Sequence, residues 1–218
     1  MDVSIVFDLD GTLIDSAPDI RGIANSLLVD EGKKPISLEE TRAFIGDGAA
    51  VFVSRMRAAR GIEDAAQDRL LAGFVSAYET AVTLTYPYPG VPQVLSDLRT
   101  AGARLGVCTN KPIRPTRAVL AHLGLEGLFG AVLGGDSLSV RKPDPGPLLA
   151  AFDALGDGPR IYVGDSDVDA ETARRADVPF LLFTEGYRKS AVADLPHAAS
   201  FNDFTDLPGL IRAVAAAR

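Results

Sequence analysis

The sequence predicts an α/β fold with a parallel sheet, helices on both faces of that sheet, and a helical insert near the N-terminus. Apolar strand-like runs alternate with segments of helical periodicity over 85–218, which favours parallel strands joined by right-handed crossovers. The stretch 17–84 differs, because it shows helical periodicity and few strand signals. We therefore expect a doubly wound, Rossmann-like core domain formed by 1–16 and 85–218, and an inserted helical domain at 17–84.

Short apolar runs bounded by turn-forming residues are typical of buried strands. The predicted strands are Val3–Phe7, Leu105–Thr109, Ala131–Leu133, Ile161–Val163 and Phe180–Phe183. Each of them except the last leads towards a cluster of Gly, Asp, Thr or Asn. Ligands of parallel α/β sheets bind beyond the carboxyl ends of the strands. Asp8, Thr109 and Asp165 all fall at such ends, so we expect them to share one site.

Helical periodicity separates the predicted strands. Val91, Val94, Leu95 and Leu98 share one helical face, and Gly102 follows as a stop. Further helices are predicted at 115–123, 147–155 and 207–217.

Breaks within the insert divide it into several helices. They lie at 32–35, at 46–48 and at Gly61. The two crossings between the insert and the core, near 15–18 and 84–90, are predicted hinges.

Composition excludes several classes of protein. A net charge of −7 supplies no basic field, so we expect neither nucleic acid nor a membrane as partner. The single cysteine, Cys108, excludes an internal disulfide and fits a reducing compartment; we expect it to be a buried apolar side chain facing away from the site. With no signal-peptide pattern and no apolar run near the ~18 residues of a membrane span, a cytoplasmic location is expected. Monomer and dimer are both open.

Asp8 and Asp10 follow the first strand and precede Gly11. Side chains two residues apart on a strand point to the same face, so the two carboxylates would lie close together. Their repulsion must be offset by a cation, by hydrogen bonds, or by a proton on one of them. A hard cation bound by oxygens would be Mg²⁺, and a protonated partner could be a general acid. The pair therefore indicates phosphoryl transfer, although such residues are also common in plain turns.

Four motifs follow one another at the predicted strand ends. They are Asp8-Leu9-Asp10-Gly11-Thr12, Thr109-Asn110-Lys111, Arg141-Lys142-Pro143-Asp144 and Gly164-Asp165-Ser166-Asp167-Val168-Asp169. Together they resemble the haloacid dehalogenase superfamily of phosphohydrolases, over essentially the whole chain. The resemblance implies that Asp8 is the nucleophile and forms an aspartyl-phosphate. It implies that Asp10 is the general acid and base, which protonates the leaving alcohol and then deprotonates the attacking water.

The resemblance also implies how the phosphate is held. Thr109 would offer its hydroxyl, and backbone N–H groups around Asn110 would donate to phosphate oxygens. Lys142 would be the fixed positive charge beside the phosphate and Asp8.

The metal site is implied in the same way. Asp8, the backbone carbonyl of Asp10 and Asp165 would bind Mg²⁺, which needs few protein ligands because it keeps several waters. Asp169 would contact a metal-bound water or orient the lysine of the third motif, and Ser166 would make a secondary contact.

The insert lies between the first two motifs, as does the small helical cap of one branch of the superfamily, which closes over the site and reads the leaving group. The stretches 8–20, 44–48 and 88–91 look particularly like bacterial phosphoglycolate phosphatases, so the expected partner is a small phosphorylated metabolite such as 2-phosphoglycolate. Gly46 and Gly48 would let the backbone approach the substrate, and Arg42 is a candidate for binding a substrate carboxylate. A plain turn and a surface arginine are the alternatives.

Other functions are open at this stage. Pyrophosphatase and sugar-phosphate phosphatase activities fit the same motifs. A phosphomutase commonly carries a cap histidine soon after the first motif, and 15–28 contains none. A true dehalogenase lacks the second aspartate of the first motif, which is present here as Asp10. A Mg²⁺-dependent phospho-accepting signalling or binding module would carry adjacent acids at the first strand, whereas here they alternate.

Overall fold

A parallel sheet forms the centre of the computed structural model, which describes residues 2–216. Its strands are β1 (Ser4–Phe7), β4 (Arg104–Cys108), β5 (Ala131–Leu133), β6 (Arg160–Gly164), β7 (Phe180–Phe183) and β8 (Ala199–Phe201). Their order across the sheet is β5-β4-β1-β6-β7-β8, and every neighbouring pair is parallel. The chain therefore builds the sheet outward from β1 in both directions. Ligands of such sheets bind where the strand order reverses, which here is the carboxyl end of β1.

Helices cover both faces of this sheet. Outside the insert they are α5 (Val91–Thr100), α6 (Ile113–His122), α7 (Gly146–Leu155), α8 (Asp167–Ala176) and α9 (Leu207–Ala216). Because strand side chains alternate between faces, Ile5 and Phe7 pack with α5, α6 and α9, whereas Val6 packs with α7 and α8. The predicted doubly wound α/β fold is confirmed. Among the described residues, no helix combines the length and apolar character that a bilayer crossing needs.

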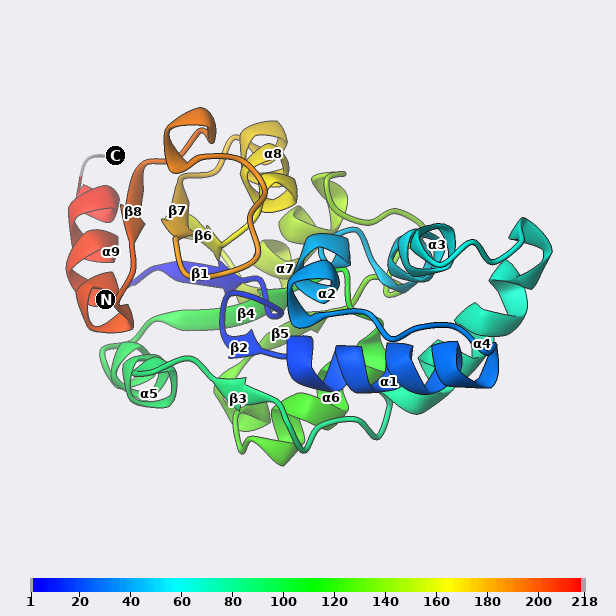
Figure 1. The fold of residues 1–218 in the computed structure, drawn as a ribbon. Coiled ribbons are helices and arrows are strands. Elements are labelled where there is room, and N and C mark those ends of the chain that lie inside the picture. The colour runs from blue at the N-terminus through cyan, green and yellow to red at the C-terminus, as the bar shows by residue number, and fades with distance from the viewer. Residues whose placement is uncertain (1, 217–218) are drawn as a thin grey trace.

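The insert is helical, as predicted. Its helices are α1 (Ala17–Asp30), α2 (Leu38–Phe44), α3 (Ala49–Ala59) and α4 (Gln67–Tyr78). They share a hydrophobic cluster of their own, in which the rings of Phe52 and Phe74 lie 5.1 Å apart between centroids. Ser37 and Glu40 form a capping box that begins α2, since each side chain accepts the other's backbone N–H. In Figure 1 these helices lie together to one side of the sheet.

Two short strands join the insert to the core. β2 (Ile14–Asp15) and β3 (Tyr86–Pro87) pair antiparallel, so the two crossings run side by side (Figure 1). Asp19 adds a second tie, because its carboxylate accepts hydrogen bonds from the backbone N–H of Leu84 at 2.9 Å and the hydroxyl of Thr85 at 2.7 Å. These are the segments predicted as hinges. The division into core and cap domains stays a prediction.

Three short strands have no counterpart in the sequence analysis: β2, β3 and β8. α8 lies between two predicted strands, where helical periodicity is expected, but no range is predicted for it. The charged residues at the start of α8 hide its helical period, and β8 is a three-residue edge strand with one buried side chain. The other helices lie close to their predicted positions. The last one ends at Ala216 in the described part of the chain, and its predicted final residue, Ala217, lies outside the described residues.

Cys108 offers a test of the packing beneath the strand ends. Its side chain is 0% exposed, and burial raises the pKa of its thiol to about 12. The thiolate is the reactive form of cysteine. We therefore expect a thiol-specific disulfide reagent at about pH 8 to leave Cys108 unmodified in the folded protein. In denaturant the same reagent should modify Cys108 rapidly, as measured by absorbance. Rapid modification of the folded protein would show that this strand end is open to solvent.

Candidate active site

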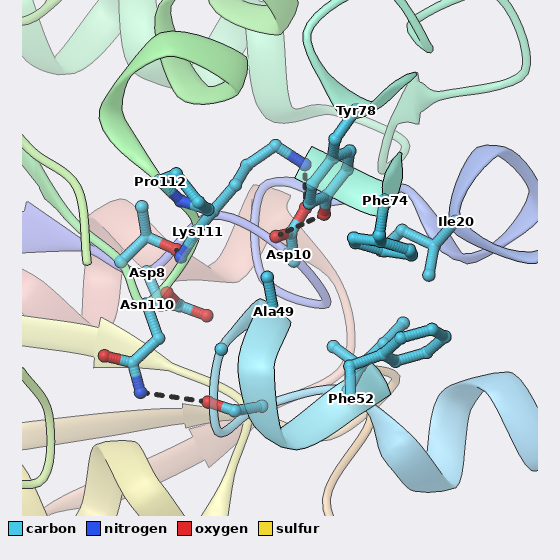
Figure 2. A pocket seen from close by; sticks show the side chains of 14 residues that line it. Asp8, Asp10, Ile20, Ala49, Phe52, Phe74, Tyr78, Asn110, Lys111 and Pro112 are labelled. Carbon is cyan, nitrogen blue, oxygen red and sulfur yellow. Dashed lines mark hydrogen bonds and ion pairs between the residues drawn. The ribbon is translucent and has the colours of Figure 1, made fainter. Parts of the chain in front are cut away.

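A cavity lies between the carboxyl ends of β1 and β4 and the helical insert (Figure 2). Residues far apart in the sequence line it. From the core these are Asp8, Asp10, Thr109, Asn110, Lys111 and Pro112, and from the insert Ile20, Ile45, Gly46, Gly48, Ala49, Phe52, Phe74 and Tyr78. The core therefore supplies charge and hydrogen-bonding groups, whereas the insert supplies a largely apolar wall.

A neighbouring cavity continues from Asp8 and Asp10 towards the end of β6. Lys142, Asp165 and Ser166 line it as well. The structure thus brings all four motifs to one place, at the edge of the sheet that the strand order indicates.

Three carboxylates gather where β1 and β6 end. Asp8, Asp165 and Asp169 are buried, and each offers one oxygen so that the three oxygens lie within 4.8 Å of one another. Burial and mutual repulsion both disfavour the charged forms. Burial raises the pKa of Asp8 to about 7, although the charge of Lys142 opposes the shift. Burial, together with the charges of the two other carboxylates, raises the pKa of Asp165 well above its ordinary range.

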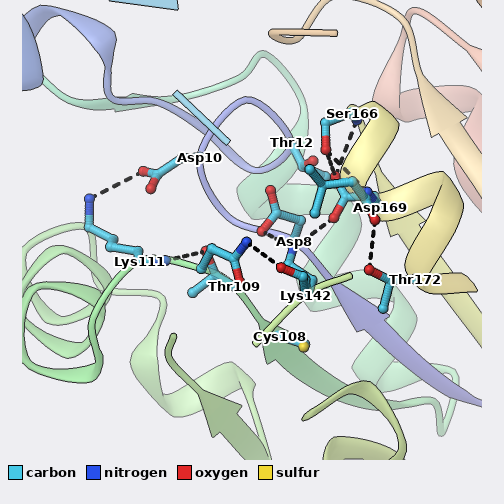
Figure 3. Close-up of polar contacts among 12 residues, drawn as sticks. Asp8, Asp10, Thr12, Cys108, Thr109, Lys111, Lys142, Ser166, Asp169 and Thr172 are labelled. Carbon is cyan, nitrogen blue, oxygen red and sulfur yellow. Dashed lines mark hydrogen bonds and ion pairs between the residues drawn. The ribbon is translucent and has the colours of Figure 1, made fainter. Parts of the chain in front are cut away.

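Lys142 neutralises part of this negative charge (Figure 3). Its ammonium donates to Asp8 Oδ1 at 2.7 Å, to Asp169 Oδ1 at 2.6 Å and to the hydroxyl of Tyr162 at 2.9 Å. Asp169 also accepts hydrogen bonds at 2.6 Å from the hydroxyls of Tyr162 and Ser166. Burial would raise the pKa of Asp169, but the lysine and these donors outweigh it and lower that pKa. Asp169 therefore holds the ammonium of Lys142 beside Asp8.

Asp165 is held by residues that the sequence analysis missed. Thr12 Oγ1 donates to Asp165 Oδ1 at 2.7 Å, and the backbone N–H of Tyr187 donates to Oδ2 at 2.6 Å. Gly11 and Gly186 pack directly on this carboxylate, since a Cβ on either would overlap Oδ2. Gly11 belongs to the first motif, so its role could have been found. Tyr187 lies 22 residues beyond Asp165, and no motif surrounds it.

Asp10 takes different partners from Asp8. The hydroxyl of Ser16 donates to Asp10 Oδ1 at 2.6 Å, and the ammonium of Lys111 lies 3.2 Å from the same oxygen. The hydroxyl of Tyr78, from the insert, lies 3.5 Å from Oδ2. Burial lowers the pKa of Lys111, and the charge of Asp10 opposes that shift. The sequence analysis gave these three partners no role.

Thr109 and Asn110 follow β4 and line the cavity with Asp8. The side-chain amide nitrogen of Asn110 donates to the backbone carbonyls of Gly46 and Lys142, each at 3.0 Å. This amide therefore ties the insert to the third motif. The backbone N–H of Asn110 donates to no acceptor within the described part of the chain, which leaves it available to an anion.

The residues expected to contact substrate from the insert fall into two groups. Gly46 and Gly48 line the cavity, with φ of +120° and +89°, a backbone conformation that glycine adopts readily. Arg42 lines neither cavity. Its guanidinium pairs with Asp15 at 2.8 Å and is 45% exposed. The structure thus places Arg42 at the junction of insert and core, and its contact with a substrate carboxylate stays a prediction.

Comparison with known proteins identifies the family. The model of the haloacid dehalogenase-like hydrolases matches residues 4–177. The chain belongs to the haloacid dehalogenase-like hydrolases. Similar members of curated function include a phosphoglycolate phosphatase of Cereibacter sphaeroides (strain ATCC 17029 / ATH 2.4.9), 49% identical over 211 residues, 95% of this chain and 97% of that protein. The phosphoglycolate phosphatase of Rhodobacter capsulatus is 44% identical over 210 residues, 95% of this chain and 96% of that protein.

A solved structure supports the same family. It is described as a predicted phosphoglycolate phosphatase from Haemophilus somnus 129PT. The match has a TM-score of 0.88 and a sequence identity of 31%, and it covers 95% of this chain and 96% of that one. The recognition of a haloacid dehalogenase-type phosphatase from the four motifs is confirmed. The roles of single residues stay predictions.

Lys142→Met tests the charge balance of the haloacid dehalogenase site. The substitution leaves the buried carboxylates of Asp8 and Asp169 without the ammonium that pairs with both, and breaking a buried ion pair on one side costs about 3–5 kcal/mol. We expect the free energy of unfolding to fall by about that amount at about pH 8, as measured by urea denaturation. Lys34→Met is the matched control, because Lys34 is exposed.

The pH dependence of this loss follows from the sign of the pKa shift. In the wild type the pKa of Asp169 is lowered, so its stabilising contribution is present above its ordinary pKa and is lost as the pH falls through the native value. In Lys142→Met the carboxylates take up protons as the pH falls, which relieves their repulsion. The destabilisation should therefore be smaller at about pH 5 than at about pH 8. Equal losses at both pH values would contradict the charge argument.

Proposed function

We propose that the protein hydrolyses a small organic phosphate monoester, with 2-phosphoglycolate as the first candidate, through an aspartyl-phosphate on Asp8. The arrangement around Asp8 carries this proposal: its carboxylate lies at the meeting point of four motifs, 2.7 Å from the ammonium of Lys142, and lines two cavities. The phosphoglycolate phosphatases to which the chain is similar support the choice of substrate. The helical insert at 17–84 would act as a cap that reads the leaving group.

The reaction has two halves. In the first, an oxygen of Asp8 bonds to phosphorus while the bond to the leaving alcohol breaks, and Asp10 gives its proton to the departing oxygen. In the second, Asp10 takes a proton from a water whose oxygen attacks phosphorus, and Asp8 departs as the carboxylate with release of inorganic phosphate. Ser16, 2.6 Å from Asp10 Oδ1, holds the carboxyl group in place for both transfers.

The phosphate group would be bound beside Asp8. Phosphoryl transfer needs mainly positioning and charge neutralisation from the protein. The ammonium of Lys142, the hydroxyl of Thr109 and the backbone N–H of Asn110 would supply three donors. Since Asp169 fixes the ammonium from the other side, this charge is in position before substrate arrives.

The carboxylate cluster fits a hard divalent cation such as Mg²⁺. Its donors are all oxygens, they are buried, and they already lie within 4.8 Å of one another. As the family resemblance implies, Asp8, Asp165 and the backbone carbonyl of Asp10 would be the ligands. Asp169 differs from Asp165 in that it pairs with the ammonium of Lys142 as well as with two hydroxyl donors. When bound, the ion would add positive charge beside the phosphoryl oxygens.

A substrate panel tests the function. Phosphate release would be measured from 2-phosphoglycolate, pyrophosphate and several sugar phosphates, first with Mg²⁺ and then with a chelator. We expect the highest kcat/KM for 2-phosphoglycolate, by at least about tenfold, which corresponds to about 1.4 kcal/mol, and loss of activity with the chelator. A better rate with pyrophosphate or a sugar phosphate would replace the proposed substrate, and turnover unaffected by the chelator would remove the metal from the proposal.

Asp8→Asn and Asp10→Asn separate the two roles. Asp8→Asn removes the nucleophile, so kcat should fall by about 10⁴-fold or more. Asp10→Asn should still form some aspartyl-phosphate but hydrolyse it slowly. Acid quenching after incubation with ³²P-labelled substrate should trap covalent phosphate on Asp10→Asn and none on Asp8→Asn.

Asp153→Asn is the control for these substitutions, because Asp153 is 70% exposed and lies outside the cavities. Substantial turnover by Asp8→Asn would rule out the nucleophile assignment. Absence of trapped phosphate on Asp10→Asn would rule out the assignment of Asp8 to the first half of the reaction and Asp10 to hydrolysis of the intermediate.

A further inference from the structure

We propose that Lys111 binds a carboxylate on the leaving group of the substrate, and so selects phosphate esters of small acids over neutral esters. The inference rests on the proposed function, because it specifies what the same site recognises besides the phosphate. The four motifs give Lys111 no role.

The position of Lys111 relative to Asp10 is the first argument. Lys142 reaches Asp8, whereas Lys111 reaches Asp10 (Figure 3). With the phosphate at Asp8, the leaving oxygen lies at Asp10, which protonates it. The carbon next to that oxygen then also lies near Asp10, and the ammonium of Lys111 is 3.2 Å from Asp10 Oδ1. A carboxylate on that carbon therefore comes within reach of Lys111.

The lining of the cavity is the second argument. Lys111 is the only basic residue among the described residues that line the cavity of Figure 2. Ile20, Phe52 and Phe74 form an apolar part of its wall, and such a wall does not compensate a buried carboxylate. The side chain of Lys111 is 3% exposed, so an ion pair formed there is little weakened by water.

The contacts of Lys111 leave it free to take a further partner. An ammonium has three donors, and within the described chain Asp10 is its only carboxylate partner. Their 3.2 Å separation is longer than the about 2.7–2.9 Å of a strong charged hydrogen bond. The ring of Tyr78 lies 3.7 Å from the ammonium, measured to its centroid, and holds it by a cation–π contact. The ammonium is therefore positioned by the insert and retains a donor.

Three other cations compete with Lys111: Arg42 and Arg55 of the insert, and Lys189 of the loop after β7. Arg42 pairs with Asp15 at 2.8 Å and lines neither cavity. Arg55 lines the second cavity but pairs with Asp47 at 2.6 Å. Lys189 lines the second cavity, but its side chain is 45% exposed and lies 3.6 Å from Asp47. Both arginines hold a carboxylate within 2.8 Å and Lys189 is half-exposed. Lys111 is buried, and its pair with Asp10 is longer, at 3.2 Å.

Lys111→Met tests the proposal with two esters that have the same carbon skeleton. 2-Phosphoglycolate and ethyl phosphate share the phosphate and a two-carbon skeleton, and only the former carries a carboxylate. Loss of one charged hydrogen bond should lower kcat/KM for 2-phosphoglycolate by about 10- to 100-fold, and that for ethyl phosphate by less than about threefold. Inhibition by inorganic phosphate should not change, because phosphate binds beside Lys142. Lys34→Met is the exposed control, and Arg55→Met tests the competing cation.

Equilibrium binding separates this inference from the proposed function, because it needs no turnover. Binding of both esters would be measured by calorimetry on Asp8→Asn, with and without Lys111→Met. Selective weakening of 2-phosphoglycolate binding by Lys111→Met would support the inference. Equal weakening of both esters, no weakening, or a selective loss in Arg55→Met instead would overturn it. Failure of the wild type to hydrolyse either ester would count against the proposed function alone.

Discussion

The site depends on one electrostatic constraint, the burial of three carboxylates where β1 and β6 end. Like charges so close together in a low dielectric need a counter-charge. Lys142 supplies one, at 2.7 Å from Asp8 and 2.6 Å from Asp169. The sheet brings Asp8 and Asp165 together, since β1 pairs directly with β6, and Gly11 and Gly186 let the backbone pass close to Asp165. A divalent cation would neutralise the negative charge that remains after Lys142 has paired with Asp8 and Asp169.

The two carboxylates of the first motif use different cations. Strand geometry predicts that Asp8 and Asp10 share a face, and both line the same two cavities. Their hydrogen-bond partners nevertheless differ: Asp8 contacts Lys142, whereas Asp10 contacts Lys111 and Ser16. Each of the two proposed roles, attack on phosphorus and proton transfer, thus falls to a carboxylate with its own hydrogen-bond partners. A positive charge beside each carboxylate reduces the repulsion between Asp8 and Asp10.

The sequence predicted those parts of the site that depend on strand ends. Asp8, Thr109 and Asp165 could be placed together because parallel strands end at one edge of the sheet. The residues that support them could not be placed in this way. Tyr187 reaches Asp165 from a loop after β7, and Arg42 turns to Asp15 rather than to the cavity. Such contacts depend on loop paths and on the position of the insert, for which local periodicity contains no signal.

The position of the insert links substrate choice to chemistry. Tyr78 of the insert contacts both Asp10 and Lys111, and the side-chain amide of Asn110 donates to the carbonyl of Gly46. The surroundings of the proposed acid and base therefore depend on how the insert lies on the sheet. In the proposed reaction, a leaving group that packs against the insert would lie beside the same side chains that contact Asp10. Under the proposed function, the leaving group and the proton donor would therefore share one set of supporting contacts.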